Sequence, residues 1–171
     1  KLHAGVDGSP RSRDAAALAE GLATACGADL LLVCAYQDPL LPVPVVAHAG
    51  GDAVHELHRL RATWAPSAHT ATVPDYSPAH GLRRTATDHD ADLLVLGSGR
   101  RIAEGHAGAG RTGRQVLHHS TCAVAFAAAG LHETPFRLRR IVAGVNGWPE
   151  GDAMFTGDSA PEGAVVAVGK S

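Results

Sequence analysis

A glycine-rich stretch with basic side chains, between residues 97 and 113, is the part of the sequence best suited to chemistry. It contains six glycines and three arginines, and it follows the apolar run 93–96. Glycine lets backbone N–H groups approach an anion closely, and a helix that starts after such a loop presents further unpaired N–H donors. We expect that helix to begin near Thr112. The pattern predicts a nucleotide or phosphate site at the end of a buried strand.

A carboxylate near the start of the chain is the second candidate. Asp7 follows the strand-like segment 1–6, and Ser9-Pro10 then has the form of a helix N-cap with proline at the first helical position. In a parallel sheet the carboxyl ends of the strands share one edge, so Asp7 and the Gly97 loop are expected to meet there. Each feature also has an interpretation without a ligand. Asp-Gly-Ser is common in ordinary turns, and a glycine-rich loop can be a mobile loop that binds nothing.

Apolar periodicity supplies the elements that must position these residues. It predicts strands at 1–6, 30–36, 69–73, 92–96 and 123–128, with helices at 10–26, at 52–63, from Pro78 and from about Thr112. Residues 37–50, with three prolines, are expected to be irregular. Strict alternation of strand and helix favours a parallel, doubly wound α/β sheet.

Composition narrows the classes of function. The 171 residues carry a formal charge of -2 and only 4% aromatic side chains, which argues against nucleic acid or an anionic membrane as a partner. No apolar run approaches the ~18 residues of a membrane-spanning helix. Three cysteines in apolar segments favour a reducing compartment. The chain opens on a strand-like segment without the pattern of a signal peptide, so a cytoplasmic location is expected.

A short repeat suggests how the chain is divided. The pattern Ala-Gly-Val-Asx-Gly-x-Pro occurs at 4–10 and again at 143–149. We therefore expect a domain over residues 1–130, a linker over 131–138 and a partial second repeat over 139–171, with a strand-like segment at 139–147. The second unit is too short to be another domain of the same type.

Three segments together resemble the universal stress protein family. They are Gly5-Val6-Asp7-Gly8-Ser9, residues 91–98, and residues 116–124, which occur in the family's order and spacing. The repeat resembles the tandem members. The resemblance implies a Rossmann-like, doubly wound, five-stranded parallel sheet with strand order 3-2-1-4-5, dimerisation through the fifth strand and, in some members, ATP binding.

The ATP-binding members of that family carry the motif G-x-x-G-x9-G-[ST]. Gly97 and Gly110 match its first and third glycines, whereas Arg100 replaces the second glycine and Arg111 replaces the hydroxyl residue. Arginine adds bulk where the backbone should approach the ligand, but it also adds charge that suits phosphate. Asp7 matches the acidic residue at the adenosine end. The resemblance thus implies ATP-binding candidates at Asp7, Gly8, Ser9, Val33, Gly97, Ser98, Arg100, Gly110, Arg111 and Thr112.

Three functions fit this sequence. The first is a stress-response module that binds an adenine nucleotide, and the second is a structural or interaction protein of the same fold that binds none. The third, less favoured, is a slow phosphohydrolase that uses the loop arginines. Enzyme activity is not favoured, because no nucleophile and base occur in a known pattern. No metal site is predicted either, since His55 and His58 share a helix face without a third ligand.

The last strand of the first unit predicts self-association. Residues Ala123–Ala128 are apolar on both faces, yet they belong to the final strand, which is expected at a sheet edge. An exposed apolar edge is a surface for strand pairing. We therefore expect a homodimer with this strand paired antiparallel across a two-fold axis, in competition with the segment around residues 141–145.

Overall fold

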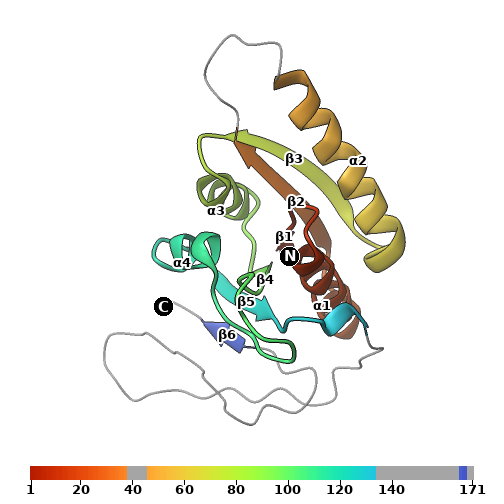
Figure 1. The fold of residues 1–171 in the computed structure, drawn as a ribbon, viewed down its shortest axis with the longest axis vertical. Helices are drawn as coiled ribbons and strands as arrows, with labels where there is room; N and C mark the ends of the chain where they lie inside the picture. Colours follow the sequence, from red (N-terminus) through yellow and green to blue (C-terminus); the bar gives the residue numbers. More distant parts are fainter. Residues whose placement is uncertain (38–45, 134–165, 169–171) are drawn as a thin grey trace.

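The computed structural model describes residues 1–37, 46–133 and 166–168, and its centre is one sheet (Figure 1). The strands are β1 (Leu2–Gly5), β2 (Leu30–Gln37), β3 (His69–Asp75), β4 (Leu93–Gly97), β5 (Ala123–Ala127) and β6 (Val166–Val168). Their order is β3-β2-β1-β4-β5-β6. The first five are mutually parallel, so the predicted order 3-2-1-4-5 is confirmed.

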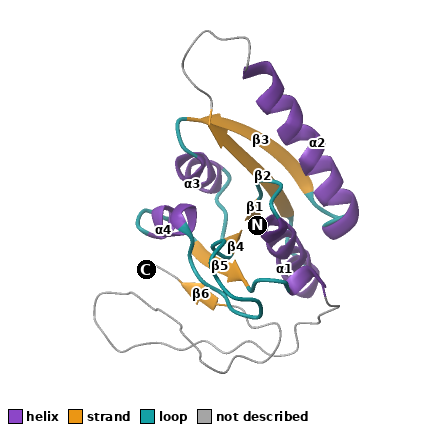
Figure 2. Ribbon diagram, viewed as in Figure 1, coloured by secondary structure: helices purple, strands orange, loops and turns teal. Residues whose placement is uncertain are grey.

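Helices cover both faces of the sheet, as a Rossmann-like fold requires (Figure 2). Helices α1 (Pro10–Cys26) and α2 (Val46–Trp64) lie on one face, while α3 (Pro78–Asp88) and α4 (Arg111–Leu117) lie on the other. Each face has its own apolar cluster against the helices. The doubly wound fold predicted from the alternation of strands and helices is therefore present.

The sequence sets the ends of α1 locally. Pro10 occupies the first turn, and Gly27 ends the helix in a left-handed conformation with φ 64°, from which its N–H donates to the carbonyl of Ala23. Ser9 is the N-cap residue, as expected, although its side chain makes no capping hydrogen bond. The start of α1 is therefore fixed beside the carboxyl end of β1.

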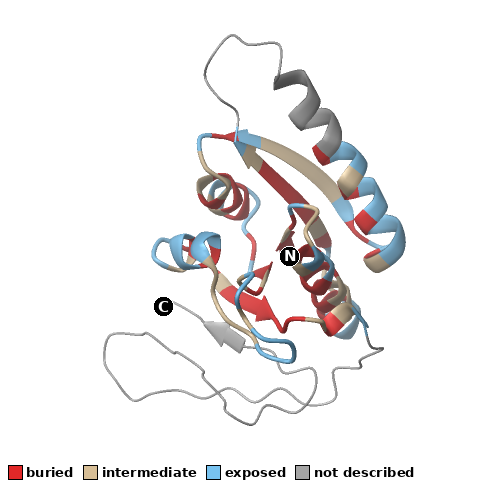
Figure 3. Cartoon of the chain, viewed as in Figure 1, coloured by how far each residue is buried: buried red, intermediate tan, exposed pale blue. Residues whose placement is uncertain are grey.

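Strand β4 lies in the middle of the sheet, between β1 and β5. Leu94 and Val95 are fully buried on opposite faces, in the two different apolar clusters. Figure 3 shows that buried residues are concentrated in the sheet and on the helices packed against it. This is the environment predicted for a continuously apolar strand in a parallel sheet. Because β1 and β4 are in register, with Gly5 beside Leu96, the chain leaves both strands at the same edge.

Two predictions need correction. Helix α2 begins at Val46, inside the segment expected to be irregular, and it runs through Gly50-Gly51 in spite of their low helix propensity. Strand β5 is not the edge of the sheet, since β6 pairs with it in antiparallel orientation. At the start of the expected linker, Leu131–Glu133 forms a 3₁₀ turn (η1), and its Leu131 is buried against the core. The bounds of the domain and the linker stay a prediction. The segment expected at 139–147 lies outside the described residues.

Candidate functional site

A cavity of about 590 Å³ opens at the carboxyl ends of β1 and β4. The loop after β1, the start of α1, the loop after β4 and the start of α4 form its walls, and Leu82 and Leu96 contribute apolar surface. It brings together most of the predicted site residues, namely Asp7, Ser9, Gly97, Ser98, Arg100, Gly110, Arg111 and Thr112. Segments about ninety residues apart in the sequence thus share one site.

Asp7 is held by its own loop. Its Oδ1 accepts hydrogen bonds from the Ser12 hydroxyl at 2.6 Å and from the Ser9 N–H at 3.0 Å. Burial alone would raise the pKa of Asp7, but these hydrogen bonds and the nearby charge of Arg100 outweigh it and hold the pKa below its ordinary value. Asp7 is therefore a fixed carboxylate at neutral pH, suited to accept hydrogen bonds from a ligand.

Gly97 has a packing role that the sequence did not reveal. A Cβ atom at this position would lie 2.2 Å from the carbonyl oxygen of Arg11, well inside the contact limit. The end of β4 therefore approaches the first turn of α1 more closely than any side chain allows. This contact places Arg11 on the wall of the cavity.

The glycine-rich loop is closed at its base. A Cβ at Gly99 would lie 2.8 Å from the Cα of Gly110, and one at Gly110 would lie 2.9 Å from the Cα of Gly99. The N–H of Gly99 also donates to the carbonyl of Gly108 at 3.0 Å. The two ends of the loop thus meet back to back.

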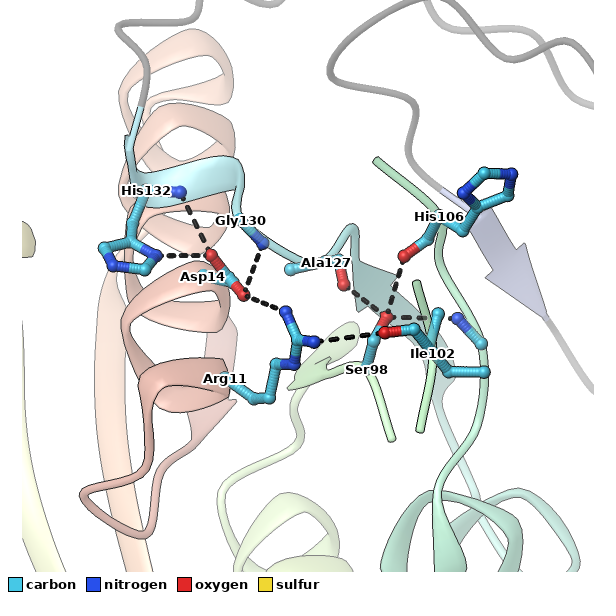
Figure 4. A network of polar contacts seen from close by, with 9 residues as sticks. Arg11, Asp14, Ser98, Ile102, His106, Ala127, Gly130 and His132 are labelled. Atoms are coloured by element: carbon cyan, nitrogen blue, oxygen red, sulfur yellow. Dashed lines mark hydrogen bonds and ion pairs between the residues drawn. The ribbon is translucent and has the colours of Figure 1, made fainter. Parts of the chain in front are cut away.

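Two side chains fasten this loop to the rest of the domain (Figure 4). The hydroxyl of Ser98 donates to the carbonyl of Ala127 at 2.6 Å and accepts from the N–H of Gly108 at 3.1 Å. Arg11 donates to the carbonyl of Ile102 at 3.1 Å. Ser98 lines the cavity, but its hydroxyl is already used to hold the loop against β5.

The fully buried Asp14 of α1 anchors the segment that follows β5 (Figure 4). Its carboxylate accepts from the N–H groups of Gly130 at 3.1 Å and His132 at 3.0 Å, and from Nδ1 of His132 at 2.6 Å. The guanidinium of Arg11 also lies near this carboxylate, with Nη1 3.6 Å from Oδ2. The Arg11 guanidinium is thus held between Asp14 and Ile102.

Two of the predicted residues lie elsewhere. Val33 is fully buried in the apolar cluster beneath α3, and its carbonyl accepts from the N–H of Val6 at 2.9 Å.

Gly8 lines a second cavity of about 730 Å³, on the α2 side of Asp7, together with Cys34. Burial, with the charge of Asp7, raises the pKa of the Cys34 thiol to about 11, so it is not a thiolate at neutral pH.

Sequence reasoning missed several wall residues of the first cavity, among them Arg11, Ser12 and Gly99. A signal for the first two was available, because the first turn of a helix that follows a parallel strand lies at the strand's carboxyl end. Gly99 was overlooked because the family motif places its second glycine at position 100.

Within the described ranges, no three His, Cys, Asp or Glu side chains lie close enough together to hold a metal ion. None of the described helices is long and apolar enough to cross a membrane.

The parallel sheet, the helices on both faces and a cavity at the strand ends define a doubly wound α/β domain. A model of the universal stress protein family matches residues 1–127. The chain therefore belongs to the universal stress protein family. No curated protein matches the sequence.

Solved structures of universal stress proteins share the fold. One from Burkholderia pseudomallei is 23% identical, with a TM-score of 0.59 over 75% of this chain and 96% of the other. UspA from Lactobacillus plantarum is 23% identical, with a TM-score of 0.53 over 74% and 95%. A universal stress protein in complex with cAMP is also 23% identical, with a TM-score of 0.51 over 75% and 95%.

Proposed function

We propose that this protein binds an adenine nucleotide, ATP or a close relative, and acts as a nucleotide-responsive member of its family. The observation that carries the proposal is one cavity of about 590 Å³ lined both by Asp7 and by the glycine-rich loop from Gly97 to Thr112. The solved relative in complex with cAMP supports an adenine nucleotide as the class of ligand.

The residues of the cavity suit the parts of such a ligand. The apolar side chains of Leu82 and Leu96 offer a surface to the base, and the ionised Asp7 accepts hydrogen bonds from the adenosine end. Arginine side chains and the backbone of the glycine loop suit the phosphates. When bound, the nucleotide supplies a multiply charged anion that draws the loop after β4 and the start of α1 onto one ligand.

Calorimetric titration of the purified protein with ATP tests this proposal, together with mass analysis of co-purified nucleotide. We expect saturable binding that Asp7→Asn weakens about tenfold, because the amide keeps an acceptor oxygen but loses the charge. Asp29→Asn is the matched control, since Asp29 is exposed next to the amino end of β2. Absence of both binding and bound nucleotide would contradict the proposal.

An interaction protein that binds no nucleotide is the second candidate. It is favoured because two residues of the motif segment have structural roles. Gly97 allows β4 to pack closely against α1, and the Ser98 hydroxyl holds the glycine-rich loop against β5. A domain that retained these residues for stability alone would show the same contacts. The titration above separates the two candidates.

We also propose a homodimer through strand β5, as the apolar sequence 123–128 predicts. In the described sheet β6 lies on this edge and pairs antiparallel with Val124, Ala125 and Phe126. A second copy related by a two-fold axis would present its own β5 in the same antiparallel sense. The chain's own segment and a second copy thus compete for one edge.

We further propose that residues 139–171 derive from a second, abbreviated repeat, as in tandem members of the family. The support is the shared pattern Ala-Gly-Val-Asx-Gly-x-Pro at 4–10 and 143–149. Strand β6 is the described part of this unit.

A further inference from the structure

Two arginines of the cavity wall, Arg100 and Arg111, each follow a glycine at the closed base of the loop. Gly99 and Gly110 are back to back, with each added Cβ less than 3.0 Å from the other's Cα. Arg100 and Arg111 are the next residues along the two chain segments, and both line the cavity. The closed base of the loop therefore starts the two side chains from neighbouring backbone positions.

Among the described residues, these two arginines are the cationic side chains of the cavity wall that have no partner. The charged wall residues are Asp7, Arg11, Arg100 and Arg111. The guanidinium of Arg11 donates a hydrogen bond to the Ile102 carbonyl and lies near the Asp14 carboxylate. Within the part of the chain that the structure describes, the side chains of Arg100 and Arg111 make no hydrogen bond or ion pair, although the charge of Arg100 reaches Asp7 and helps to lower its pKa.

We propose that Arg100 and Arg111 form a clamp for the phosphate groups of the ligand. This inference rests on the proposed nucleotide site and names the residues that would select a polyphosphate there. The two positions are those at which the family motif has a glycine and a hydroxyl residue. The chain would thus replace backbone and hydroxyl contacts with two guanidinium groups.

The chemistry of guanidinium suits this role. Each arginine offers a planar set of five N–H donors that matches two phosphate oxygens at once, and its charge is permanent. A charge-assisted hydrogen bond is about twice as strong as a neutral one. The clamp therefore favours a polyphosphate chain over a neutral nucleoside, and its effect is confined to the anionic part of the ligand.

The test uses the full chain and the variants Arg100→Gln and Arg111→Gln. Arg101→Gln and Arg114→Gln are matched controls, because these arginines are exposed neighbours that do not line the cavity. Binding of ATP, adenosine and inorganic tripolyphosphate is measured by calorimetry. All four arginines are exposed, so the variants are expected to fold, and thermal unfolding checks this.

We expect each clamp variant to weaken ATP and tripolyphosphate about tenfold and to leave adenosine unchanged. The controls should change every affinity by less than about twofold, because distant surface charges are screened. Equal losses in the clamp variants and the controls would overturn the clamp, since they would reflect net charge alone.

Comparing the three ligands distinguishes a failure of the clamp from a failure of the proposed function. If ATP binds the parent and both clamp variants equally, the clamp is wrong and the nucleotide site stands. If tripolyphosphate binds through the two arginines while ATP and adenosine do not bind, the clamp stands and the proposed function fails. If the parent binds none of the three, both are wrong.

Discussion

His3 shows how a single residue makes this fold sensitive to acid. It is 2% exposed on β1, its Nδ1 has no hydrogen-bond partner among the described residues, and its ring lies 5.5 Å from that of His89. Burial, with the charge of His89, lowers the pKa of His3 from 6.5 to about 4. The folded protein therefore keeps this imidazole neutral where the unfolded chain protonates it.

This pKa predicts a loss of stability as the pH falls from about 6.5 to about 4. In that window the unfolded state binds more protons than the folded state, so the free energy of unfolding decreases on acidification, by on the order of 3 kcal/mol from this group. His3→Leu should remove this part of the pH dependence. Urea unfolding across the window measures it, with the exposed His58→Leu as control. Parallel stability curves for the parent and His3→Leu would contradict the assignment.

The candidate residues could be predicted from the sequence only where a motif or a strand end marked them. Asp7, Gly97 and Gly110 were found because each follows or ends a recognisable segment, and all three line the cavity. Val33 does not line this cavity, because the face of a strand residue depends on the register with its neighbours and its side chain lies in the core. The structural use of Ser98 depends on Ala127, which no local pattern connects to it.

At the scale of elements, the contact between β4 and α1 gives the sharpest prediction. Gly97→Ala would place a methyl carbon against the backbone of Arg11, and the backbone cannot move aside as a flexible side chain can. We expect a loss of about 1–3 kcal/mol in the free energy of unfolding, as is typical of overpacking.

Gly108→Ala is the matched control in the same loop. Its added Cβ would meet only the end of the Ile102 side chain at 3.0 Å, which can turn away. Chemical unfolding of the two variants should show a clearly larger loss for Gly97→Ala. Similar losses would mean that the close approach of β4 and α1 is not what requires glycine at position 97.

The elements themselves were largely predictable, because β2, β4 and β5 are continuous apolar runs and the long helix α1 has a periodic apolar face. The beginning of α2 was not predictable, since Gly50-Gly51 has low helix propensity and the three prolines before it favour an irregular segment. Strand β6 was not predicted as a sheet member, because three residues carry too little local signal and the pairing partner is more than forty residues away.

At the scale of the whole molecule, the edge of β5 controls association. If β6 and a second copy compete for this edge, weakening β6 should favour the dimer. Ala167→Pro removes a backbone donor at the centre of β6 and is expected to increase the dimer fraction. Val124→Pro, on β5 itself, should instead abolish association. Sedimentation across a concentration series measures both.

Two results would contradict this account of association. One is a parent and an Ala167→Pro variant that both remain monomeric at high concentration. The other is a Val124→Pro variant that folds and keeps the mass of a dimer, because the dimer would then use another surface.

The location of the nucleotide is the central claim, and amide chemical-shift mapping by NMR tests it most directly. On addition of ATP we predict the largest shifts at the backbone N–H groups of Gly97, Gly99, Gly110 and Thr112, which line the first cavity. The amides of Glu56 and Arg59, on the wall of the second cavity, should shift little. Shifts centred on Glu56 and Arg59, or no shifts at saturating ATP, would contradict the site described for this protein.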